Sequence, residues 1–206
     1  MSEIGLFPLP LVLLPTEQVP LHIFEERYKE LIAECLAEDL EFGLVFADED
    51  GLREVGTRAA VVEVLPTEFE DGRMNIIIEG RERFRVLRLT RGRSFQTAET
   101  APLEDADDHA PPELVERARA LFGRLSDLTG SGVDTPEPDT PQLSYALAAR
   151  VAELATDLRL ALLAEVSESV RLERVCEVLE EAAVLVERQR RVAERAARNG
   201  KVDFGI

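Results

Sequence analysis

Side chains that carry out covalent chemistry are few in this chain of 206 residues. Its lysines, Lys29 and Lys201, lie near opposite ends, and neither stands in the glycine spacing of a phosphate-binding loop or beside a serine. No serine occupies the Gly-x-Ser-x-Gly turn of a serine hydrolase. We therefore expect neither phosphoryl transfer nor nucleophilic hydrolysis, and we expect the protein not to be an enzyme.

Histidine and cysteine are equally sparse, and their positions disfavour a metal site. His22 and His109 are far apart and have no neighbouring cysteine, so they give no zinc-binding pattern. We expect a structural hydrogen bond for His22 and solvent exposure for His109. Cys35 and Cys176 each fall on the apolar stripe of a predicted helix, which indicates reduced, buried thiols. The sequence predicts no metal and no cofactor.

Arginines form one concentrated stripe in the first half of the chain. Arg81, Arg83 and Arg85 alternate along a predicted strand, where they either bind a carboxylate or phosphate or, as we favour, pair with acids across the sheet. The net charge of −17 gives a surface that repels nucleic-acid phosphates and anionic lipids. We therefore expect no nucleic-acid partner and no membrane partner.

The elements that position these residues are mainly strands in the first half. The apolar run 6–14 contains Pro8 and Pro10, which lack backbone donors and so favour an edge strand. Residues 19–24 form a second predicted strand, and Glu25 opens a helix. The apolar stripe of this helix consists of Tyr28, Leu31, Ile32, Cys35 and Leu36.

Further strands are predicted at 59–68, 73–79, 81–89 and 95–100. Asp71-Gly72 supplies a tight turn, Gly80 permits a reversal or bulge, and a change of alternation indicates a bulge near Val86. The residues Met74, Ile76 and Ile78 share one predicted face. An acidic stretch with prolines, 104–112, is typical of a linker.

The second half has the apolar spacing of helices. One helix follows 114–128 and stops at Gly130. Thr140 and Pro141 begin a second, whose stripe consists of Leu143, Leu147, Val151 and Leu154. A third helix is predicted near 158–165, and Ser167 or Ser169 caps a long fourth. We expect an α+β protein with a β domain at 1–105 and a helical domain at 106–206.

The segment 6–28, LFPLPLVLLPTEQVPLHIFEERY, resembles the opening of the substrate-binding amino-terminal domain of Lon proteases, which cereblon also contains. The resemblance extends over about 4–187 and includes Gly43, Gly56, Gly80, Arg83, Phe84 and the helical segment SVRLERVCEVLEEAAVLVE. It departs from the family at Thr16, where glycine is commoner, and at Glu26, where proline is commoner. The resemblance implies a PUA-like β pseudobarrel with one helix, followed by a helical bundle that ends in a long helix.

The same resemblance implies a stand-alone, non-catalytic domain that recognises unfolded or otherwise exposed apolar segments of other proteins. The family positions that become candidate recognition residues are His22, Phe24, Glu25, Arg27, Tyr28, Arg81, Arg83 and Phe84. Sequence spacing alone assigns no role to any of them.

Three alternatives remain open, together with assembly into a homo-oligomer. An adaptor or regulator would dock on a protease or another enzyme through the helical bundle or through an arginine-rich tail. The candidate residues of this tail are Arg188, Arg190, Arg191, Arg195 and Arg198. An RNA-binding PUA-like module and an enzyme with a small ligand in a barrel pocket are the others. No apolar run is long enough to span a membrane and the amino terminus lacks a basic stretch, so we expect a cytoplasmic protein.

Overall fold

The computed structural model describes residues 2–66, 72–151 and 154–199. Contacts divide the chain into two compact units, each described by itself below. Unit 1 consists of Met1–Asp107 and Val151–Ser167, and unit 2 consists of Asp108–Arg150 and Glu168–Ile206. Strands and helices both contribute, which confirms the predicted α+β class.

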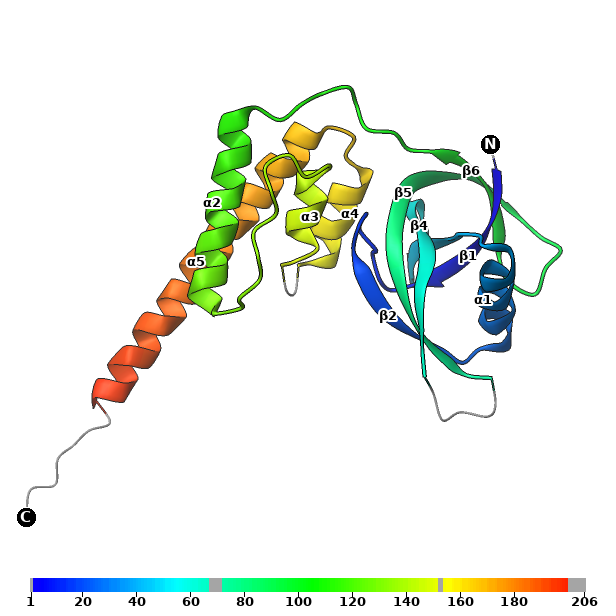
Figure 1. Cartoon of the computed structure of the whole chain (residues 1–206), viewed down its shortest axis with the longest axis horizontal. Coiled ribbons are helices and arrows are strands. Elements are labelled where there is room, and N and C mark those ends of the chain that lie inside the picture. The colour runs from blue at the N-terminus through cyan, green and yellow to red at the C-terminus, as the bar shows by residue number, and fades with distance from the viewer. Residues whose placement is uncertain (1, 67–71, 152–153, 200–206) are drawn as a thin grey trace, which may run out of the picture. The chain divides into compact units, whose positions relative to one another are not determined.

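Unit 1 is built on a curved sheet. Its strands are β1 (Ser2–Leu9), β2 (Gln18–Ile23), β3 (Phe42–Asp48), β4 (Gly51–Leu65), β5 (Met74–Thr90) and β6 (Thr97–Pro102). They lie in the order β2-β5-β4-β3-β1-β6, and an additional β5–β6 pairing closes the sheet on itself. Among the strands that the structure describes, only β1 and β3 pair in parallel. Figure 1 shows the strands curving into a barrel-like arrangement, which confirms the predicted pseudobarrel.

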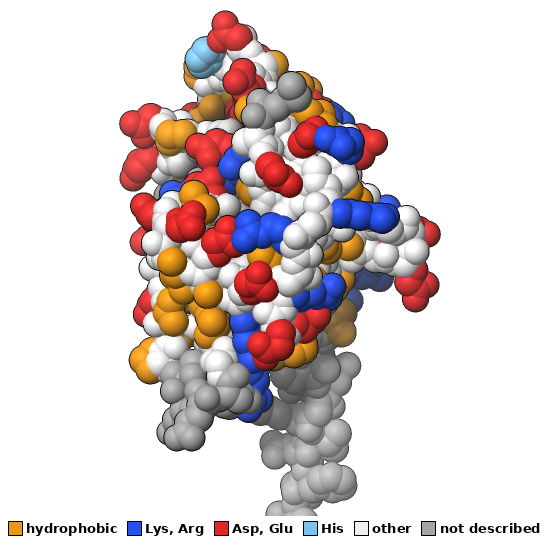
Figure 2. Space-filling view, turned by 90° about the vertical axis from the view of Figure 1, so that its right-hand side faces the viewer, with side chains coloured by type: hydrophobic (Ala, Val, Ile, Leu, Met, Phe, Trp, Pro, Cys, Tyr) orange, Lys and Arg blue, Asp and Glu red, His pale blue; other side chains and the backbone are white. Residues whose placement is uncertain are grey.

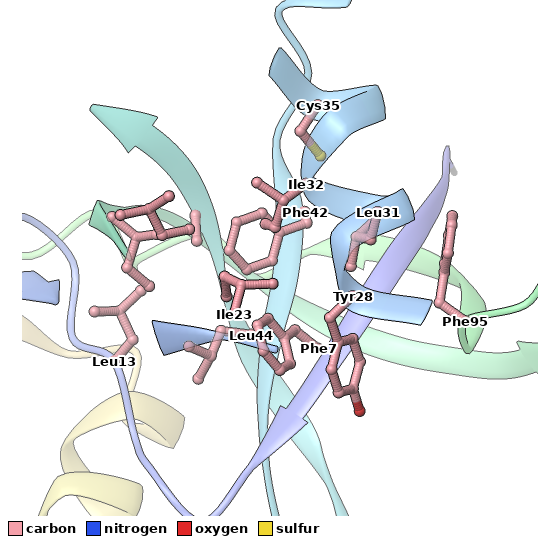
Figure 3. Packing of buried hydrophobic residues seen from close by; sticks show 13 residues of the cluster. Phe7, Leu13, Ile23, Tyr28, Leu31, Ile32, Cys35, Phe42, Leu44 and Phe95 are labelled. Atoms are coloured by element: carbon pink, nitrogen blue, oxygen red, sulfur yellow. The ribbon is translucent and has the colours of Figure 1, made fainter. Parts of the chain in front are cut away.

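Helix α1 (Glu26–Glu38) packs its predicted apolar stripe into this barrel. Figure 3 shows Tyr28, Leu31 and Ile32 directed from α1 toward the sheet residues Phe7 and Phe42. The rings of Phe7 and Tyr28 stack with centroids 4.0 Å apart. The stripe was predicted one residue too long, because Leu36 is 45% exposed where it borders a hollow beside the last turn of α1.

A second cluster of buried side chains explains why glycine occurs at two of the positions that resemble the family. The ring of Phe84 is fully buried on β5, and a Cβ atom on Gly43 or Gly56 would approach its Cζ atom to 2.7 or 2.8 Å. Contacts that close are repulsive, so only glycine leaves room for the ring at both positions. Phe84 is therefore a core residue.

Strand β1 differs from its prediction in position and length. It is not an edge strand, because Ser2–Gly5 pair with β6 and Leu6–Leu9 pair with β3. Pro8 is tolerated because only β3 pairs with that half of the strand. The strand also ends at Leu9 and not at Leu14.

The residues 12–14 are buried although they lie outside any strand, and side chains replace their missing ladder partners. Thr57 Oγ1 donates to the carbonyl oxygen of Leu13 at 2.6 Å, and Arg159 Nη2 donates to that of Val12 at 2.9 Å. Buried backbone groups need such partners, so this segment is held by residues distant in sequence.

Strand β5 runs continuously through Gly80, where a bulge and not a reversal is present. The β4–β5 register shifts between Thr57 and Ala59, opposite Gly80, and the β5–β6 register shifts between Val86 and Arg88. The second shift confirms the predicted bulge near Val86. In the predicted Asp71-Gly72 turn, Asp71 lies outside the described residues.

Helix α4 (Thr156–Ala164) belongs to unit 1, whereas we expected it in the helical domain. Arg83, whose side chain is 2% exposed, donates from Nη1 to the carbonyl oxygens of Leu163 and Glu165 at 2.7 and 2.6 Å. It also pairs with Asp105. These bonds attach the segment that follows α4 to the sheet.

Unit 2 consists of α2 (Pro112–Thr129), α3 (Leu143–Ala148) and α5 (Glu168–Asn199). Figure 1 shows α2 and α5 side by side. They run parallel, because the ion pairs Arg117–Glu180 and Arg124–Glu187 advance along both helices in the same direction. The long terminal helix was predicted correctly.

The predicted start of α3 was wrong. Thr140 does not cap it, because Gln142 adopts a left-handed conformation with φ 49° and the helix begins only at the next residue. The Glu168 carboxylate of α5 instead accepts hydrogen bonds from the backbone N–H and the Oγ of Ser144, at 2.9 and 2.6 Å. The fully buried Arg171 also donates to Glu168, at 2.7 Å.

The amino terminus of α5 is capped from the linker. The Asp108 carboxylate accepts from the backbone N–H groups of Glu168 and Ser169, both at 3.2 Å. A carboxylate at this position satisfies free N–H groups and suits the positive end of the helix dipole.

Replacement of Arg83 by methionine tests the buried attachment. The substitution leaves two carbonyl oxygens and Asp105 without their donor, so we expect the free energy of unfolding to fall by about 3–5 kcal/mol in urea titrations. Arg85→Met is the matched control, because Arg85 pairs with Glu54 at 3.1 Å on the exposed face. The Arg85→Met substitution should lower the free energy of unfolding by less than about 1 kcal/mol. Equal losses in the two variants would contradict this role of Arg83.

Candidate functional site

Three of the predicted recognition residues are buried in unit 1 and hold the fold. Tyr28 is 6% exposed and packs on Phe7, and burial raises its pKa. Arg83 and Phe84 face the interior as described above. Side chains in these positions offer no surface to a partner.

The other members of the predicted motif are at the surface. His22 Nδ1 lies 2.7 Å from Asn75 Oδ1, which is the hydrogen bond expected of it, and its ring stacks on the 59% exposed Phe24. Arg27 pairs with Glu25 at 2.7 Å, and its guanidinium lies over the Tyr28 ring.

The three alternating arginines do not share one face. The bulge after Gly80 turns Arg83 inward, while Arg81 and Arg85 stay exposed. Arg81 pairs with Glu79 at 2.7 Å, and Arg85 and Arg83 also pair with acids. Only the Arg85 pair crosses between strands as we predicted, since Glu79 is on the same strand as Arg81 and Asp105 lies outside the strands that the structure describes.

The arginine-rich tail continues α5 in unit 2. Arg188, Arg190, Arg191 and Arg195 are exposed, whereas the side chain of Arg198 lies outside the described residues. Three apolar side chains of the same helix are more than half exposed, namely Val184 at 61%, Leu185 at 56% and Val192 at 60%.

A hollow of about 600 Å³ opens in unit 1 between α1, β1 and the β5–β6 connection. Its apolar wall is formed by Ile4, Leu31, Cys35, Leu40 and Phe95, and its charged wall by Glu3, Glu34, Asp39, Glu41, Arg58, Arg91 and Arg93. Gly5 permits this packing, because a Cβ atom there would lie 2.4 Å from Leu31 Cδ1 and 3.0 Å from the Phe95 ring.

A second hollow of about 450 Å³ lies beside the first. It is lined by Cys35, Leu36, Asp39, Leu40, Glu41, Ala60, Val61, Arg81 and Glu82. Both hollows share the residues around the end of α1, where Leu36 is 45% and Leu40 is 47% exposed. We refer to the two hollows together as the α1 groove.

Several charged groups at the rim of the α1 groove pair with one another. Arg93 pairs with Glu34 and also lies over the Phe95 ring at 4.7 Å. Arg58 lies 3.8 Å from Glu41 and donates to Ser2 Oγ at 2.8 Å. On the face viewed in Figure 2, acidic and basic side chains are interspersed, with apolar side chains exposed among them.

Cys35 lies in the wall of both hollows. Burial, with a smaller effect of the Glu34 charge, raises the pKa of its thiol to about 11. Burial likewise raises the pKa of Cys176. Both cysteines are free and buried, as predicted. At neutral pH these thiols are protonated and therefore poor nucleophiles.

Within residues 2–66, 72–151 and 154–199, no three or more His, Cys, Asp or Glu side chains converge as a metal site requires. None of the helices in these ranges combines the length and apolar composition needed to cross a bilayer.

Sequence reasoning did not find the α1 groove. Its residues come from α1, four strands and two loops, and no local pattern joins them. The one available signal was Leu40, an apolar residue placed after the helix stripe ends and followed directly by the charged Glu41.

Comparison with known proteins gives one family and two similar structures. A family model described as the ATP-dependent protease La (LON) substrate-binding domain matches residues 3–181. A Lon N-terminal domain protein from Xanthomonas campestris is 28% identical, with a TM-score of 0.66 over 85% of this chain and 97% of that one. The N-terminal domain of a Mycobacterium avium complex Lon protease is 17% identical, with a TM-score of 0.65 over 89% and 98%, which shows a shared fold.

The reactivity of Cys35 tests the apolar wall of the groove. In a Cys176→Ser variant, we expect alkylation by iodoacetamide to rise with a midpoint near pH 11, against 9.0 for an ordinary thiol. Because the folded thiol has the higher pKa, its contribution to stability is complete below pH 9.0 and is lost as the pH rises toward 11. The same variant unfolded in urea is the control. If the pH midpoint of alkylation in the folded protein were close to that of the unfolded chain, water would have access to the Cys35 thiol and the apolar wall would be contradicted.

Proposed function

The chain belongs to the family of ATP-dependent protease La (LON) substrate-binding domains, and on this premise we propose that it binds exposed apolar segments of other proteins in the α1 groove. Two exposed leucines chiefly support the proposal, namely Leu40, which lines both hollows, and Leu36, which lines the second. An apolar side chain in solvent is stabilised when another apolar surface covers it.

The size and composition of the groove support this proposal. Ligand sites usually occupy about 300–1,000 Å³ and combine an apolar floor with a few polar groups. The first hollow has this volume, and its floor includes the rings and aliphatic chains of Phe95, Leu31 and Ile4. An extended segment that crosses Leu40 would reach both hollows.

We propose a non-catalytic role for the same groove. The Cys35 thiol is held in its unreactive form, because its pKa is raised to about 11. Glu34 and Glu41 face Arg93 and Arg58, so these carboxylates serve as ion-pair partners. The small-ligand enzyme that we considered gains no support from this arrangement.

Free-energy magnitudes limit the affinity of one copy. Covering roughly 400 Å² of apolar surface yields about 10 kcal/mol at ~25 cal/mol/Å², and association costs about 4–15 kcal/mol. The net gain is small, so a monomer binds unfolded chains weakly. Useful affinity then requires several copies or delivery to a partner assembly.

A second candidate function is that of an adaptor or regulator that docks on a protease or another enzyme through α5. Between 187 and 201 the chain carries six cationic and two acidic residues, within a protein of net charge −17. Leu185 and Val192 form an exposed apolar pair beside Arg188. A helix face of this kind suits an acidic, amphipathic partner.

Leu40→Asp tests the groove. Titration with a reduced, carbamidomethylated and therefore permanently unfolded protein, followed by fluorescence anisotropy, should show a Kd at least about tenfold higher, because one buried leucine contributes ~1.5–3 kcal/mol. Leu87→Asp is the matched control, since Leu87 on β5 is 48% exposed and lines neither hollow. Similar weakening by both variants would mean that the groove is not the binding surface.

Removal of residues 188–206 separates the two candidate functions. If the groove binds unfolded segments, the truncated protein should retain the Kd of the full chain for the same unfolded probe, within about twofold. Under the adaptor alternative, the truncation abolishes co-purification of a partner from native lysate. A large loss of unfolded-protein binding on truncation would show that α5 takes part in recognition.

A further inference from the structure

The charges that remain without partners differ between the two ends of the α1 groove. In the first hollow, Arg93 and Arg58 are engaged by Glu34, Glu41 and Ser2. Arg91 is exposed at the same rim and has no hydrogen-bond or ion-pair partner in the parts of the chain that the structure describes. Among the described residues, the unpaired charges that line this hollow are therefore the Arg91 guanidinium and the Asp39 carboxylate, and Asp39 lies on the side shared with the second hollow.

The Arg91 guanidinium borders the apolar wall of the first hollow. Phe95 and Leu31 are 4% and 3% exposed, and together with Ile4 they line the hollow that Arg91 borders. A ligand that places a carboxylate at Arg91 and an apolar side chain on Phe95 satisfies both surfaces at once. Arginine matches a carboxylate with two parallel hydrogen bonds.

The second hollow has the opposite character. Among the described residues, the carboxylates of Asp39 and Glu82 have no hydrogen-bond or ion-pair partner. The last turn of α1 contains no basic residue, so the negative end of the helix dipole is also uncompensated there. A cationic group of a ligand would relieve this excess of negative charge.

We propose that the first hollow binds the terminal carboxylate of a polypeptide whose last residue is apolar. The preceding residues cross Leu40, and a lysine or arginine of the bound chain lies at Asp39 and Glu82 in the second hollow. This inference rests on the proposed function and names its substrate class, namely carboxyl-terminal segments with a basic residue upstream of apolar ones.

A chain end suits this geometry better than an internal acidic residue. The hollows share their lining on the side of Leu40, so a bound chain continues from Arg91 in that direction. A terminal residue also carries its carboxylate and its apolar side chain on the same Cα atom. An internal glutamate or aspartate would need a second exit for the chain.

Calorimetric titration with two synthetic peptides tests the inference. Both have a lysine followed by apolar residues and a final leucine, and they differ only in a free carboxylate or a carboxamide at the end. The wild-type protein should bind the free acid at least about tenfold more tightly than the amide, since hydrogen bonds to charged groups are the strong ones. High salt should reduce this preference.

Variants assign the preference to one side chain. Arg91→Gln should bind the two peptides equally, and Arg91→Lys should retain part of the preference. Arg85→Gln is the control, because it removes an exposed arginine that lines neither hollow. Because Arg91 is exposed, its replacement should leave the free energy of unfolding in urea unchanged. This measurement verifies that the variants are folded.

The outcomes separate the two proposals. If acid and amide bind equally to the wild type while Leu40→Asp weakens both, carboxylate recognition is wrong and the proposed function stands. If neither peptide binds, or if Leu40→Asp has no effect, the proposed function fails. Full displacement of the peptide by decanoate at equal concentration would overturn the assignment to polypeptides in favour of small carboxylates.

Discussion

The guanidinium of Arg83 lies inside unit 1, where it donates to the carbonyl oxygens of Leu163 and Glu165 and pairs with Asp105. A buried charge is costly unless hydrogen bonds surround it, and a planar group with several donors meets that condition better than an ammonium. The backbone near Arg83 is fixed by these bonds. Since the neighbouring Arg81 and Glu82 line the α1 groove, the shape of the groove depends on a buried contact outside it.

Local patterns predicted the elements whose stability depends on neighbours in sequence. The apolar spacing of α1 identified Tyr28, Leu31, Ile32 and Cys35 correctly, and the changed alternation in β5 identified its second bulge. The family resemblance singled out Gly43, Gly56 and Phe84. Only the structure gives the physical reason, which is that two glycines on adjacent strands leave space for one ring.

Two of the wrong predictions share a cause, because each depends on a hydrogen bond between residues that are distant in sequence. Val12 and Leu13 read as strand, yet their carbonyls are satisfied by Arg159 and Thr57. Likewise, α3 begins where Glu168 of α5 accepts a hydrogen bond from the backbone N–H of Ser144. The α1 groove was missed because its lining residues, such as Arg91 and Leu40, are far apart in sequence and come together only in the folded unit.

The chain passes from unit 1 to unit 2 after Asp107, returns at Val151 and leaves again after Ser167. During ribosomal synthesis, the strands therefore emerge long before the carbonyls that receive Arg83. Until Glu165 has left the exit tunnel, that arginine must stay hydrated or find temporary partners. The order of translation thus delays the last buried contacts of unit 1 until the segment that follows α4 has emerged.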